Sequence, residues 1–237
     1  MKTSLIVIVF IAATSFAGFA QTTTSSAPAQ KKANTGQVAV PDHSKAAKSA
    51  AKPSAADMDK MMKEMMEMSK LNENHKLLSS MDGDWDYTVK MWMDGNTSGT
   101  PQESKGVATR KTIMDGRYVT MDVNGTMQMP GADGKPMDMP FHGMGLEGYD
   151  NVKKKFVASW IDSMGTGIEF SEGKYDPATK TFTYSMDMEP MAGMKTKVRE
   201  VIKITDNTHM MLEWYETAAK PGSKEKKTME ISYTKKS

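Results

Sequence analysis

The chain has 237 residues, no cysteine and a formal net charge of +2. Disulfides are therefore excluded, and the fold must be held together by buried apolar surface. The lysines are scattered along the chain, which argues against a nucleic-acid partner, since such partners need a concentrated basic surface. Methionine is unusually frequent, at 25 residues, whereas in most proteins it only fills gaps in the core.

The first 20 residues, MKTSLIVIVFIAATSFAGFA, have the form of a signal peptide. Lys2 gives a positive start, residues 5–13 are apolar but too short to cross a bilayer, and Gly18 and Ala20 are small residues at a cleavage point. We expect cleavage after Ala20 and export to the periplasm or the medium of a bacterium. No membrane span is expected after cleavage.

Residues 21–56 are mostly Ala, Ser, Thr, Lys, Pro and Gln, which predicts a disordered tether. Residues 57–80 contain neither Gly nor Pro and predict one amphipathic helix. At 100° per residue its methionines share an arc of roughly 160°; they are Met58, Met61, Met62, Met65, Met66 and Met68. This Met face predicts packing on the domain, self-association, or binding of a hydrophobic partner or Cu(I).

From residue 81 to residue 237 the hydrophobic period changes from 3.6 to 2. Strands are predicted near 84–94, 103–114, 117–129, 139–149, 155–162, 166–175, 180–188, 195–205, 209–217 and 226–234. Turn residues separate them every ten or so positions, which favours consecutive antiparallel pairing. We therefore predict an all-β domain, an up-and-down antiparallel β-barrel of about ten strands preceded by one amphipathic helix. A two-sheet sandwich is the alternative.

The first predicted strand begins with Gly83-Asp84-Trp85, which is similar to the Gly-x-Trp signature of the lipocalin and calycin superfamily. In those barrels the tryptophan closes one end, and a basic residue from a late strand packs over it. The resemblance implies Arg199 in that role, with Lys235 as the alternative.

A second resemblance is spread over the chain from about residue 72. It is carried by His75-Lys76-Leu77-Leu78, Gly83-Asp84-Trp85, Met139-Pro140-Phe141-His142-Gly143, Gly148-Tyr149-Asp150-Asn151, Trp160-Ile161-Asp162-Ser163, Gly165-Thr166-Gly167, Val198-Arg199-Glu200 and Met229-Glu230-Ile231-Ser232-Tyr233-Thr234. These segments resemble uncharacterised bacterial exported proteins, the domain of unknown function 1579 family. The resemblance implies no particular activity.

One predicted strand places a carboxylate on an apolar face. Val198, Ile202 and Ile204 share a face with Glu200, while Arg199 lies on the other. A carboxylate inside a barrel is costly unless it is paired or reached by water or a ligand, so Glu200 predicts either a rim salt bridge or a polar anchor in a ligand cavity. The predicted function is a non-enzymatic module that holds a small, largely apolar ligand. Its predicted binding residues are Trp85, Tyr149, Trp160, Arg199, Glu200 and Trp214.

Two methionine clusters suggest an alternative function, periplasmic binding of Cu(I) by soft thioether ligands. Their candidate ligands are Met137, Met139, His142, Met144, Met191 and Met194. Pro140 cannot donate to a sheet, so we expect the paired strand to begin after it, with His142 and Met144 on one face. A haem-binding barrel that uses His142 or His209 is a second alternative.

A catalytic function is not predicted. The chain has four histidines, no cysteine and no Gly-x-Ser-x-Gly motif. Ser163, Asp162 and His142 have the side chains of a nucleophile–base relay, but their spacing in the sequence does not require them to meet. We therefore assign no catalytic residue.

Overall fold

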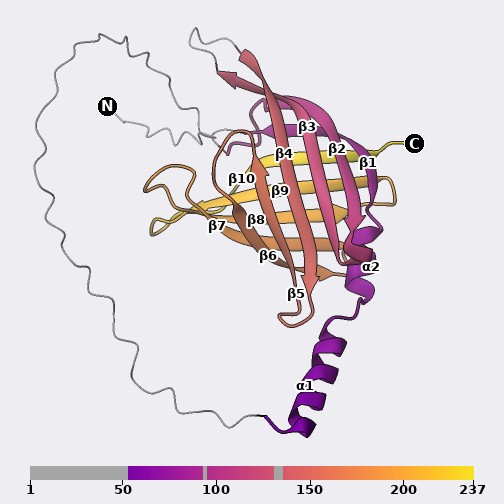
Figure 1. The fold of residues 1–237 in the computed structure, drawn as a ribbon. Helices are drawn as coiled ribbons and strands as arrows, with labels where there is room; N and C mark the ends of the chain where they lie inside the picture. Colours follow the sequence, from indigo (N-terminus) through magenta and orange to yellow (C-terminus); the bar gives the residue numbers. More distant parts are fainter. Residues whose placement is uncertain (1–52, 93–94, 131–135) are drawn as a thin grey trace, which may run out of the picture. The chain divides into compact units, whose positions relative to one another are not determined.

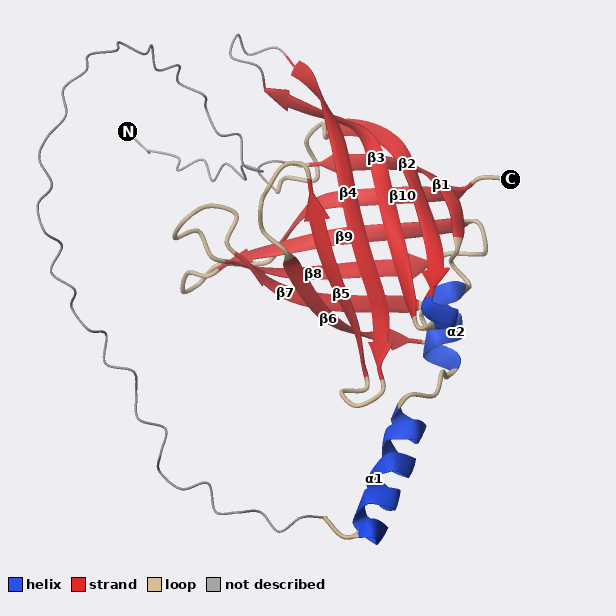
Figure 2. Ribbon diagram, viewed as in Figure 1, coloured by secondary structure: helices blue, strands red, loops and turns tan. Residues whose placement is uncertain are grey.

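The computed structural model describes residues 53–92, 95–130 and 136–237; the predicted signal peptide and the tether up to residue 52 lie outside them. The strands are β1 (Gly83–Met91), β2 (Gln102–Ile113), β3 (Tyr118–Pro130), β4 (Pro136–Asp150), β5 (Lys155–Asp162), β6 (Glu169–Asp176), β7 (Thr181–Met188), β8 (Thr196–Ile204), β9 (His209–Ala218) and β10 (Lys226–Lys235). Each pairs antiparallel with the next, and β1 pairs with β10, which closes the barrel (Figures 1 and 2). The predicted fold class is confirmed.

The two ends of the barrel differ in their connections. At one end, the α2 end, strands are joined by residues 114–117, 151–154, 177–180 and 205–208. At the other, the loop end, the connections that the structure describes in full are the longer segments 163–168, 189–195 and 219–225. Short connections fix neighbouring strands closely, whereas longer loops are where binding residues are commonly carried.

Two helices precede the barrel where the sequence predicted one: α1 (Ala55–Met68) and α2 (Glu73–Ser79). The break occurs because Asn72 caps α2: its side chain accepts a hydrogen bond from the Asn74 N–H at 2.9 Å, and its own N–H donates to His75 Nδ1. The six methionines of the α1 Met face are all exposed, and self-association through it stays a prediction. Neither described helix is long and apolar enough to cross a membrane.

Helix α2 contacts β2, β3 and β4 at the α2 end (Figure 1). Leu78 of this helix, Met81 after it and Trp85 at the start of β1 are all buried, and Trp85 is only 2% exposed. The Trp85 indole donates to the Met81 carbonyl oxygen at 3.2 Å. Burying large apolar side chains at this depth stabilises the closed end by roughly 1.5–3 kcal/mol each.

Lys235, from the last strand, packs over Trp85 with its Nζ 5.4 Å from the ring centroid. The prediction that Arg199 takes this place is wrong, and its alternative is confirmed. Arg199 points outward, where it pairs with Glu225 and stacks on Tyr215. The side-chain alternation of β8 sets this direction, because Glu200 takes the inward position.

Strand β4 begins at Pro136, and Pro140 is paired with Thr126 of β3. The expectation that pairing starts only after Pro140 is therefore wrong. The reason is that β5 joins β4 only from Gly143 onward. Residues 136–142 thus have a sheet neighbour on one side, and proline is tolerated on such an edge.

Candidate ligand-binding interior

The inner wall of the barrel carries a row of three chemically different side chains. Tyr184 of β7 lies opposite Glu200 of β8, which lies opposite Trp214 of β9. All three occupy inward positions of their strands, as the alternation of buried and exposed residues indicates. The predicted inward direction of Glu200 is confirmed.

A second row runs beside it and is built around Trp160 of β5. Trp160 pairs with Gly145 of β4 on one side and with Glu169 of β6 on the other. Its ring lies so close to Gly143 and Gly145 that a Cβ atom at Gly143 would overlap it. The two glycines, which have no Cβ, therefore make room for the indole against the wall.

Both inner-wall tryptophans donate to a carboxylate two residues further along the same strand. Trp160 Nε1 lies 3.0 Å from Asp162 Oδ2, and Trp214 Nε1 lies 3.0 Å from Glu216 Oε1. Thr228 also donates to Glu216. Period 2 puts residues i and i+2 on one face, so each pair places an aromatic ring and an acid together on the inner wall towards the loop end.

A buried ion pair lies deeper in the barrel. Arg110 of β2, 5% exposed, donates from Nη2 to Glu147 Oε2 of β4. Within the part of the chain that the structure describes, Arg110 Nε and the Tyr184 hydroxyl have no hydrogen-bond partner. Buried polar groups are rarely left unpaired, so these two atoms mark a polar region that its own side chains do not satisfy.

The interior shifts the proton affinity of its acids. Burial, together with the nearby Glu147 and Glu169 and against the opposing effect of Arg110, raises the pKa of Glu200 to about 8. Burial and Asp162 also raise the pKa of Glu169. Burial holds the pKa of Tyr184 well above its usual value. At neutral pH Glu200 is therefore mostly a neutral carboxylic acid.

Burial changes along the barrel axis. Near the α2 end, inward residues such as Val119, Phe156 and Phe182 are 1–2% exposed and close-packed. Towards the loop end, inward residues such as Trp160 and Trp214 keep part of their surface accessible to solvent. The barrel is thus packed at one end, while its inner wall remains partly accessible towards the other.

The structure brings three of the predicted binding residues together on the inner wall: Trp160, Glu200 and Trp214. Trp85 and Tyr149 instead belong to the packed α2 end, where the Tyr149 ring contacts His75 and Phe156. Arg199 lies on the outer face.

Sequence reasoning missed four residues of the interior: Arg110, Glu147, Glu169 and Tyr184. Alternation alone could have flagged Arg110, since it follows Gly106 and Ala108 at spacing 2 on a strand whose other positions include Lys105, Thr109 and Lys111.

The candidate copper ligands lie on both faces of β4, with Met137 and Met139 on one and His142 and Met144 on the other, and in the 189–195 connection. Met144 and His142 point outward, and His142 Nε2 lies 3.1 Å from Asp122 Oδ2. Met139 is on the opposite face of the same strand, and Met191 and Met194 lie in the 189–195 connection. No group of three or more His, Asp or Glu side chains in residues 53–92, 95–130 and 136–237 could hold a metal ion.

The haem and relay hypotheses depend on exposed histidines. His209 contacts Asp206 and Thr208 at a turn of the α2 end. The backbone N–H of His142, not its imidazole, donates to the Ser163 hydroxyl, and the Asp162 carboxylate accepts a hydrogen bond from the Trp160 indole. Ser163, Asp162 and His142 therefore do not form a proton relay in the structure.

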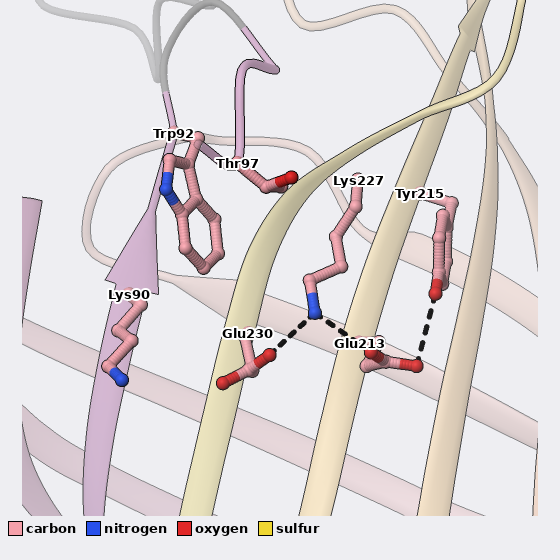
Figure 3. A pocket seen from close by; sticks show the side chains of 7 residues that line it. All are labelled: Lys90, Trp92, Thr97, Glu213, Tyr215, Lys227 and Glu230. Atoms are coloured by element: carbon pink, nitrogen blue, oxygen red, sulfur yellow. Dashed lines mark hydrogen bonds and ion pairs between the residues drawn. The ribbon is translucent and has the colours of Figure 1, made fainter. Parts of the chain in front are cut away.

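An open groove of about 440 Å³ lies on the outer face beside β1, β9 and β10 (Figure 3). Lys227 stands at its centre and donates to Glu213 at 2.8 Å and to Glu230 at 2.5 Å, while the Tyr215 hydroxyl donates to Glu213. Trp92 borders it, with Lys227 Nζ 5.7 Å from the ring centroid. The central charges of this groove satisfy one another, in contrast to the interior.

The geometry defines a closed ten-stranded antiparallel barrel with a mixed aromatic and acidic inner wall. The chain belongs to the family described as "Protein of unknown function (DUF1579)", whose family model matches residues 70–235. No curated protein matches the sequence. Among solved structures, the chain is similar to a redesigned beta barrel. The match covers 68% of this chain and 96% of that one, with 15% sequence identity and a TM-score of 0.32.

Proposed function

We propose that this protein is a non-enzymatic binding module that holds a small, largely apolar ligand inside its barrel. One observation carries the proposal: the inner wall is packed at the α2 end, while Trp160, Glu200 and Trp214 stay partly accessible towards the loop end. Sites for small ligands are mostly apolar and aromatic, with a few polar groups that fix orientation. This part of the inner wall has that composition.

The signal-like first 20 residues support the further proposal that the protein works after export, in the periplasm or outside the cell. The predicted mature chain then begins at Gln21. Sequencing the amino terminus of the protein recovered from the periplasm or the medium tests this; an intact Met1 would contradict it.

Binding can be tested with Nile red, a neutral dye that fluoresces in apolar surroundings, titrated into the mature chain. We expect a saturable increase in fluorescence at one site per chain. Ala158→Phe fills the inner wall between Glu147 and Ser171 and should abolish the increase. The matched control is Ser159→Phe, which adds the same ring on the outer face of the same strand.

Urea unfolding of both variants checks that each is folded. The function fails if wild type shows no saturable binding, or if folded Ala158→Phe binds as well as wild type does.

A further inference from the structure

We propose that the ligand held in the barrel carries a positively charged nitrogen, an inference that rests on the proposed binding function. The first reason is the supply of acids on the inner wall. Glu200 and Glu169 point inward, and within the described ranges neither forms an ion pair. Asp162 and Glu216 add two more carboxylates beside the tryptophans. The charge of Arg110 is offset by its ion pair with Glu147, although the Arg110 Nε–H has no partner within the described chain.

The second reason is the Tyr184 hydroxyl, which is independent of the acids. Tyr184 is 1% exposed, its hydroxyl has no partner within the described chain, and it sits opposite Glu200 in the strand register. A phenol oxygen can accept a hydrogen bond from a ligand N–H. Glu200 and Tyr184 together thus offer a carboxylate and a neutral acceptor to one ammonium group.

The third reason is the pair of aromatic walls. Trp160 and Trp214 flank the acids, and an indole face attracts a cation, more strongly when water is excluded. A metal cation is a poorer match, because the described residues provide no group of metal-binding acids and histidines. The ligand class that fits is therefore an organic amine with an apolar body.

Binding of such a cation has a measurable consequence for protons. The groups that face Glu200 are Glu147, Glu169, Arg110, Tyr184 and Tyr233. Burial, then Glu147 and Glu169, and against the opposing effect of Arg110, raise the pKa of Glu200 and leave its carboxyl mostly protonated at neutral pH. A bound ammonium stabilises the carboxylate and displaces that proton. Uptake of the amine at pH 7 should therefore release about one proton per site.

The experiment compares three probes with one naphthalene body: 1-naphthalenemethylamine as the cation, 1-naphthalenemethanol as the neutral analogue and 1-naphthoic acid as the anion. Each displaces Nile red from the mature protein at pH 7. We expect the amine to bind at least about tenfold more tightly than the alcohol, and the acid most weakly. Calorimetry in phosphate and in Tris measures the proton released with the amine.

Glu200→Gln keeps the shape of the neutral acid but cannot ionise, so it should fold. It should lower amine affinity to within about threefold of the alcohol and abolish proton release. Glu172→Gln, on the outer face of β6, is the control and should change none of these.

Equal affinity of amine and alcohol, or tighter binding of the acid, overturns the cation inference while Nile red binding keeps the proposed function intact. If neither Nile red nor any of the three probes binds, both proposals fail.

Discussion

Glu200 makes the stability of this barrel depend on pH in an unusual direction. Its pKa rises from 4.5 in the unfolded chain to about 8 in the folded one. Between these values the folded protein holds a proton that the unfolded chain has released, so the free energy of unfolding falls as pH rises. Below about pH 4.5 both states are protonated and above about pH 8 both are ionised, so the contribution stops changing outside this window.

The size of the effect follows from the same pKa difference. At about 1.4 kcal/mol per pH unit, the loss between pH 4.5 and 8 is at most about 5 kcal/mol. Buried groups respond as if their surroundings were more polar than a dry protein interior, which reduces such a penalty. We therefore expect a loss of about 2 to 5 kcal/mol, a large share of the stability of an ordinary domain.

Urea unfolding followed by tryptophan fluorescence, at steps from pH 5 to pH 9, measures this loss. Glu200→Gln cannot ionise and should gain stability relative to wild type as pH rises, with most of the gain complete by pH 9. Glu172→Gln is the control, because ion pairs with Lys155 and Lys153 lower the pKa of Glu172 and move its titration to acid pH. A constant difference between wild type and Glu200→Gln from pH 5 to pH 9 would refute the reasoning.

Three further substitutions test the fold, each by urea unfolding. Arg110→Met leaves the Glu147 carboxylate unpaired in the interior and should lower the free energy of unfolding by about 3–5 kcal/mol. Adding Glu147→Gln to Arg110→Met should restore part of this loss. A loss below about 1 kcal/mol for Arg110→Met would contradict a buried ion pair. Gly83→Ala should lower the free energy of unfolding by about 1–3 kcal/mol, because φ is +135° at this position and the new Cβ meets the Lys235 side chain. Adding Lys235→Ala should remove the contact with the side chain but not the backbone strain. Phe170→Ser, at a side chain that is 71% exposed, should change stability by less than about 0.5 kcal/mol.

The strands could be predicted because period 2 is a local signal. The predicted starts and ends mostly fall within a residue or two of the observed ones, and the inward direction of Glu200 followed from three aliphatic neighbours at even spacing. Trp160 and Trp214 were predicted as aromatic walls of a cavity; both lie at inward positions, and their role in binding stays a prediction. The alternation of apolar and polar residues shows which side chains lie on the same face of a strand.

The alternation within a strand does not show which side chains of other strands it will contact across the barrel. The Arg110–Glu147 pair joins residues 37 positions apart on strands that are not hydrogen-bonded to each other. Arg199 was placed over Trp85 by resemblance, although its own strand pattern turns it outward. Pairing was expected to begin only after Pro140, because the sequence does not show that this part of β4 has a neighbour on only one side.

The four tryptophans provide the most direct test of a binding interior, because each reports on a different part of the protein. Trp160 and Trp214 lie on the inner wall, Trp85 is in the packed α2 end, and Trp92 borders the outer groove. In proton–nitrogen NMR spectra their indole N–H groups give separate signals. On titration with 1-naphthalenemethanol, we predict that the Trp160 and Trp214 signals move together and saturate, while those of Trp85 and Trp92 stay in place. Movement of the Trp92 signal with unchanged Trp160 and Trp214 signals would place binding outside the barrel and contradict the account.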